Sequence, residues 1–241
     1  TSNPSPAYVS AVARAFADNG AGMRGDMKAV LKAVLMHPEA RTVSDTSGKV
    51  REPVLRLSAY LRAFPHASDS GHYRIGATDN PGTQLGQSAL RSPSVFNFYR
   101  PGFVPPGTAT AARGLVAPEL QIASETSAAG YVNYMRDGVS AGVGITAGAP
   151  FNRRDLQPDF SAELALAATP AALVDRVASR LTYGSAGAAL KAEITSAVGA
   201  INVPTLNAGG TNQAQIDAAK RNRVNAAILL TLASPEFVVL K

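Results

Sequence analysis

The first 64 residues repeat apolar positions with the period of amphipathic helices. Helices are predicted over residues 6–18, 24–37 and 53–64. Pro6 and Pro53 suit the first helical turn, because that turn has no use for the amide hydrogen that proline lacks. The side chains expected to face inward are Tyr8, Val9, Val12, Phe16, Met27, Val30, Leu31, Val34, Leu35, Val54, Leu57, Leu61 and Phe64.

The helical period returns in the second half of the chain. Between the two halves, residues 65–113 are rich in Pro, Gly, Ser, Asp and Asn, and no period lasts there. A Gly-rich loop region is expected at 138–160, and a polar loop at 42–49. The further helices are predicted at 116–136, 170–183, 188–201 and about 213–233.

These patterns predict a mostly α fold. We expect an irregular bundle of about seven helices with long Pro/Gly-rich loops. Residues 1–241 would form a single helical domain, and 65–113 would be a long irregular excursion from it. Apolar residues make up 46% of the chain, which is enough to build a buried core.

Composition and charge narrow the classes of function. The chain has no cysteine, which excludes disulfides and cysteine metal sites. The net charge of +6 lies entirely within residues 1–113, but the basic residues stand singly, so we expect no nucleic-acid partner. No apolar run is long enough to span a membrane. The opening letters, "TSNPSPAYVS", suggest a point inside a larger protein.

The stretch "SPSVFNFYRPGF", residues 92–103, concentrates aromatic side chains in a chain that has few. Burying such rings would contribute on the order of 2 kcal/mol each, so one interpretation is a loop packed into the core. The other is a recognition surface, in which Arg100 stacks on a ring or binds an acid. On the second interpretation, Phe96, Tyr99 and Arg100 are the predicted binding residues.

Residues with catalytic or metal-binding chemistry are sparse. His66 and His72, with Asp69 between them, match no standard metal spacing, so no metal site and no cofactor is predicted. Glu52 could cap the helix that follows it. Glu125, expected in the middle of its helix, is the acid that capping explains least. These two glutamates are the candidate catalytic residues, and whether the protein is an enzyme stays open.

Several segments, taken in order, resemble a known family. They are "NPSPAYV", "MRGDMKAVLKAVLMHPEAR", "GKVREPVLRLSAYLRAF", "LGQSALRSPSVFNFYRPGF", "APELQI" and the terminal "LASPEF". The series resembles the C-terminal half of the bacterial domain of unknown function 1800 family. The likeness covers most of residues 1–125, returns at 226–237 and is weak over 138–215. On this resemblance, we expect the family's N-terminal half to be absent from this chain.

The resemblance implies a largely helical bacterial protein, often carrying an export signal. Its genes often neighbour those of a second uncharacterised exported family with a phosphatase-like fold. The resemblance supplies no catalytic residues. The expected function is therefore a non-enzymatic assembly or partner-binding module, periplasmic or secreted. Its partner would be a protein, either the rest of its own chain or a co-encoded exported protein. The alternative is a hydrolase of an envelope or extracellular polymer, whose site the missing half completes.

Overall fold

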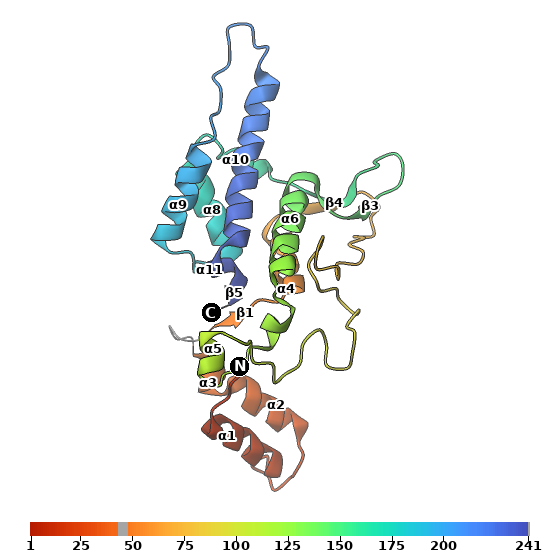
Figure 1. Ribbon diagram of the computed structural model, residues 1–241, viewed down its shortest axis with the longest axis vertical. Coiled ribbons are helices and arrows are strands. Elements are labelled where there is room, and N and C mark those ends of the chain that lie inside the picture. The colour runs from red at the N-terminus through yellow and green to blue at the C-terminus, as the bar shows by residue number, and fades with distance from the viewer. Residues whose placement is uncertain (43–47, 241) are drawn as a thin grey trace. The chain divides into compact units, whose positions relative to one another are not determined.

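The computed structural model describes residues 1–42 and 48–240 (Figure 1). Most of the expected loop at 42–49 lies outside these residues. The helices are α1 (Pro6–Ala17), α2 (Met27–Met36), α3 (Pro38–Arg41), α4 (Pro53–Ala63), α5 (Ala109–Ala112), α6 (Glu125–Ala141), α7 (Ser161–Leu164), α8 (Pro170–Thr182), α9 (Ala188–Gly199), α10 (Gln213–Ala233) and α11 (Pro235–Val238), with a 3-10 helix η1 at Pro118–Ile122. The strands are β1 (Lys49–Val50), β2 (His66–Ser68), β3 (Val143–Thr146), β4 (Arg154–Pro158) and β5 (Val239–Leu240). The described residues contain seven helices of ten residues or more, which confirms the mostly α prediction.

The chain divides into two compact units, where the sequence pattern predicts a single domain. Unit 1 contains Thr1–Val50 and Tyr99–Gln121. Unit 2 contains Arg51–Phe98 and Ile122–Leu240. The chain therefore passes from unit 2 back to unit 1 within the aromatic stretch, between Phe98 and Tyr99.

Unit 1 contains a hairpin of helices α1 and α2. Ser5 caps α1 by accepting a hydrogen bond from the amide of Tyr8. Tyr8 is buried, stacks on His37 with ring centroids 4.4 Å apart, and donates its hydroxyl hydrogen to the Val34 carbonyl. Asp26 caps α2 through the first backbone amides of that helix. Val12, Val30 and Val34 are half-buried, so the caps and the Tyr8 ring act together with apolar contacts between the two helices.

The core of unit 2 gathers around α10. This helix packs against α6, α8 and α9, and α4 packs against α8 (Figure 1). The apolar end of α10 is buried, and its Ile228 and Leu232 have no exposed surface. Other large side chains with almost no exposed surface are Tyr60, Phe64, Leu85, Met135, Leu173, Leu181 and Phe237.

Residues 138–160 are not the loop that their glycines suggested. They hold the end of α6 and the strands β3 and β4, which pair antiparallel, and β2 pairs with the other edge of β4. Gly144 is one of the glycines that suggested a loop, and its position has another explanation. Its φ is +100°, and a Cβ there would lie 2.4 Å from the carbonyl oxygen of Arg74. The glycine therefore allows close backbone approach and does not indicate a loop.

The helix predicted at 116–136 also needs correction. Residues Pro118–Ile122 form the 3-10 helix η1, and α6 begins only at Glu125 and continues to Ala141. The boundary is a capping box, in which Ser124 accepts from the amide of Ser127 and Ser127 accepts from the amide of Ser124. This reciprocal cap satisfies amides that a continuous helix would have bonded internally.

Candidate functional site

Helix α2 exposes an apolar stripe that its sequence pattern assigned to the interior. Met27 and Leu31 are each 56% exposed, and Leu35 is 67% exposed. Their spacing of four residues places the three side chains on one face of the helix, the α2 face. None of the ten residues of α2 is buried. Exposure of several large apolar side chains in one place is typical of surfaces that bind a partner.

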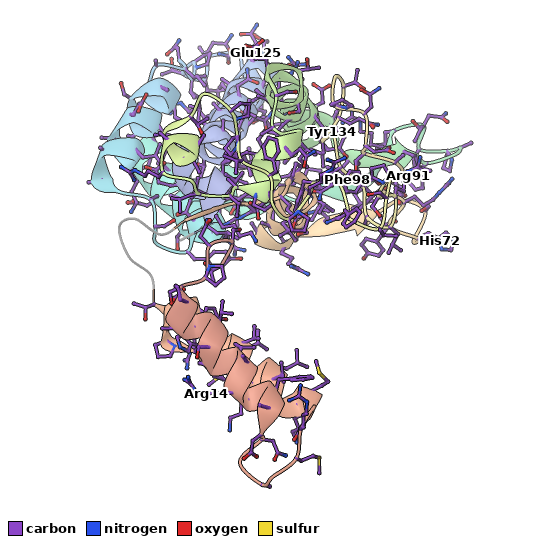
Figure 2. All side chains as sticks on the ribbon, turned by 60° about the horizontal axis from the view of Figure 1, so that its bottom comes forward. Arg14, His72, Arg91, Phe98, Glu125 and Tyr134 are labelled. Atoms are coloured by element: carbon purple, nitrogen blue, oxygen red, sulfur yellow. The ribbon has the colours of Figure 1, made fainter. Side chains whose placement is uncertain are left out.

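Two lysines border the α2 face. Lys28 and Lys32 each follow a residue of the stripe, so helical geometry sets both on the same edge of it. Both are exposed, and no ion pair to either is found in the part of the chain that the structure describes. Arg14 adds a further exposed cation to the hairpin (Figure 2).

The carboxylates of the hairpin are bound by other groups. Asp26 accepts hydrogen bonds from the side chain of Asn19 and from backbone amides, and these lower its pKa. Glu39 accepts from the hydroxyl and the amide of Ser5, which likewise lowers its pKa. These carboxylates form no ion pair with Lys28 or Lys32 among the described residues, so the α2 face combines an apolar stripe with two exposed cations. Such a surface suits a partner that is apolar at its centre and acidic at its rim.

A shallow groove of about 400 Å³ runs between α1 and α2. Alanines line much of it, and Lys32 and Met36 stand at its α2 side. Met36 is 54% exposed. The groove and the α2 face thus lie on either side of the lysine edge of one helix, which widens the surface that a partner could cover.

The predicted binding residues fall in both units. Phe96, in unit 2, is 60% exposed, whereas Phe98 is half-buried. Tyr99 and Arg100 belong to unit 1, where Tyr99 is half-buried and Arg100 is exposed. The amide of Arg100 donates to the side chain of Gln121. The stretch is therefore neither wholly buried nor wholly exposed, and its three candidate residues stay predictions.

The two candidate catalytic acids occupy different surroundings. Glu52 accepts a hydrogen bond of 2.6 Å from the buried Gln87 and makes no side-chain cap to α4, where capping was expected. Glu125 is not mid-helix but the first residue of α6, and it is exposed (Figure 2). A carboxylate in a first turn is stabilised by the helix dipole, so its position has a structural explanation after all.

The histidines do not assemble with acids. His37 ends α2, and its Nδ1 accepts from the amide of Glu39. Asp69 forms two hydrogen bonds with Arg153, at 2.7 and 3.0 Å, and His72 is exposed. Among residues 1–42 and 48–240, no cluster of three or more His, Cys, Asp or Glu could hold a metal ion.

The α2 face was missed because its residues were assigned to the core. The signal was present, since eight of the ten residues of α2 are apolar and only Lys28 and Lys32 are polar. Packing against α1 alone cannot bury an apolar surface that extends this far around the helix.

In the described residues, no helix has the length and hydropathy to cross a membrane. Comparison with curated proteins and with solved structures gave no match. Residues 1–239 match the family described as "Protein of unknown function (DUF1800)". The match covers nearly the whole chain, including the weakly resembling residues 138–215. The chain therefore belongs to the DUF1800 family.

Proposed function

We propose that this chain is a non-enzymatic partner-binding module of an exported bacterial protein. It would bind another protein at the cell envelope, in the periplasm or after secretion. The bacterial and exported parts of this proposal rest on the family resemblance. Its partner would be the rest of its own chain or a co-encoded exported protein.

The α2 face is the observation that carries the proposal. Three large apolar side chains stand more than half exposed on a helix whose N-terminus is already capped by Asp26. Removing such side chains from water stabilises a complex by roughly 25 cal/mol per Å² of apolar surface. Lys28 and Lys32 would favour a partner with carboxylates around its apolar contact.

The described residues give less support to the alternative function, a hydrolase. A catalytic acid would be marked by a raised pKa in a deep polar pocket. The described carboxylates with a shifted pKa are Asp26, Glu39, Asp155 and Asp159, and all four are shifted downward. Hydrogen bonds to the ionised form cause these shifts, which suits structural roles.

The test is affinity capture of the full-length protein from its native host. Wild type is compared with a Leu31→Gln/Leu35→Gln variant and with Leu206→Gln, a control at a loop leucine that is 58% exposed. We expect one defined protein to be captured by wild type and by the control but not by the α2 variant. A Lys28→Gln/Lys32→Gln variant should weaken capture, and added salt should weaken the wild type in the same way.

A second variant addresses the aromatic stretch. Replacing Phe96, Tyr99 and Arg100 with alanine would remove the predicted contacts there. Loss of the same partner by this variant, with its circular dichroism unchanged, would add the stretch to the binding surface. Capture of the same proteins by wild type and by the α2 variant would overturn the proposal.

A further inference from the structure

Unit 2 contains a pocket of about 470 Å³, whereas the α2 face belongs to unit 1. The end of α4, strand β2, residues 73–75, strand β4 and α8 supply its walls. Leu61, Ile75 and Leu156 provide apolar lining, and Leu156 is almost fully buried. The volume is within the range of small-molecule sites, which are commonly 300 to about 1,000 Å³.

The walls of this pocket are held by hydrogen bonds that need no ligand. Antiparallel pairing sets Ser68 of β2 opposite Leu156 of β4. The carboxylate of Asp155 accepts from the amides of Ser70 and Arg74, each at 2.7 Å, and so holds the loop that follows β2. Because this wall is already ordered, the protein would lose less conformational entropy when a ligand binds.

The charged groups of the pocket are all basic. Arg62 and Arg180 line it, and no carboxylate does. Arg180 donates to the carbonyl of Ala63, which aims its guanidinium at the α4 end of the pocket. Glu163, the nearest acid to Arg180 at 4.0 Å, is held more closely by Arg176. Arg62 is exposed, and the described residues provide it with no hydrogen bond or ion pair.

His66 forms part of the wall and is not the anion-binding group. Its Nδ1 lies 2.8 Å from the Phe64 carbonyl, and the edge of its ring contacts Tyr60. Burial lowers the pKa of His66, although the carbonyls of Phe64 and Leu61 act in the opposite direction. Burial therefore disfavours the charged form of this ring, and the two arginines supply the positive charge of the pocket.

We propose that this pocket binds a small carboxylate that carries an apolar body. The carboxylate would lie between Arg62 and Arg180, since a planar guanidinium binds a carboxylate through paired hydrogen bonds. The apolar body would cover Leu61, Ile75 and Leu156. Tyr73, which is 61% exposed, stands at the opening, where its ring can cover the ligand.

The test uses 2-naphthoate and its neutral counterpart 2-naphthamide, which share shape and differ in charge. Titration calorimetry with the full chain should show binding of the naphthoate and at least about tenfold weaker binding of the amide, because a charged hydrogen bond is lost. Arg62→Gln should weaken naphthoate binding by a similar factor. Arg221→Gln, at an exposed arginine of α10, is the matched control and should leave binding unchanged.

The ring signals of His66 show where the ligand binds. Naphthoate is expected to shift these proton resonances in wild type and in the Arg221 control. Equal affinity for acid and amide would overturn the proposal, and so would absence of binding at millimolar concentration. Binding that neither shifts His66 nor depends on Arg62 would place the ligand elsewhere and would also overturn it.

Discussion

Asp155 shows at the scale of one residue how a buried charge shapes unit 2. Burial opposes its ionisation, but the amides of Arg74 and Ser70 and the hydroxyls of Ser70 and Ser68 outweigh burial. Together they lower its pKa to about 2. The carboxylate therefore favours folding above the ordinary Asp pKa of about 4. That contribution is lost as the pH falls from about 4 to about 2.

Asp155→Asn should lower the urea midpoint of unfolding at pH 7, because the amide cannot accept all of these hydrogen bonds. The difference from wild type should shrink as the pH falls toward 2, where the wild-type carboxylate becomes protonated. Asp175→Asn is the control, since Asp175 is mostly exposed and pairs with Lys191 on the surface. A difference between Asp155→Asn and wild type that stays constant from pH 7 to pH 2 would contradict this account.

Gly130 of α6 lies directly against residues 81–84 of the irregular region. A Cβ at this position would lie 2.2 Å from the Pro81 carbonyl oxygen and 3.0 Å from that of Gln84. Gly130→Ala should cost about 1–3 kcal/mol of unfolding free energy, as overpacking does. At Gly199 of α9 the nearest atom to a new Cβ is 4.0 Å away. Gly199→Ala should be neutral or stabilise by up to about 1 kcal/mol.

Urea unfolding of the two alanine variants measures both effects. Equal stability of Gly130→Ala and wild type would show that the packing of residues 81–84 on α6 is wrong. A large loss of stability in Gly199→Ala would show instead that alanine at position 199 is poorly tolerated for a reason other than steric contact.

Helix positions were well predicted from sequence, because their signals are local. Proline starts and apolar periods set α1, α4, α8, α9 and α10 close to their observed ends. Both Pro-Glu sequences that follow apolar helices, at Pro38 and Pro235, begin a further short helix, α3 and α11. His37 and Ser234 cap these short helices. Each proline therefore follows the end of one helix and also occupies the first position of the next.

Strands and site residues were harder to predict, because their partners are distant in sequence. Asp155 binds a loop more than 80 residues earlier in the chain. The pairing of β2 with β4 spans a similar separation and has no local pattern. Exposure of Leu31 and Leu35 could not be predicted, because periodicity shows which residues share a face but not what that face meets.

The α2 face should contribute little to the stability of its own helix. Leu31→Gln and Leu35→Gln should each change the free energy of unfolding by less than about 0.5 kcal/mol, as exposed substitutions do. Tyr8→Ala, in the same hairpin, should cost about 3 kcal/mol, because the buried ring fills the contact between the helices. Urea titration followed by circular dichroism compares them. A large loss in either leucine variant would mean that the α2 face packs within the chain.

At the scale of the whole molecule, the two units carry different chemistry. Unit 2 holds the large core and the arginine-lined pocket. Unit 1 holds the helical hairpin whose apolar face and lysines we propose as a protein-binding surface. Lys28 and Lys32 of that face are two of the basic residues of residues 1–113, the part of the chain that carries the net positive charge.

The central claim is that the α2 face binds another protein, and site-specific photo-crosslinking tests it most directly. A benzophenone amino acid would replace Leu31 in one sample and Leu206, which is similarly exposed, in another. After irradiation in the native host, position 31 should crosslink to one protein through a peptide with apolar and acidic residues. Position 206 should not crosslink to that protein. Crosslinks from position 31 only to other positions within residues 1–241, or the same products from both positions, would contradict the claim.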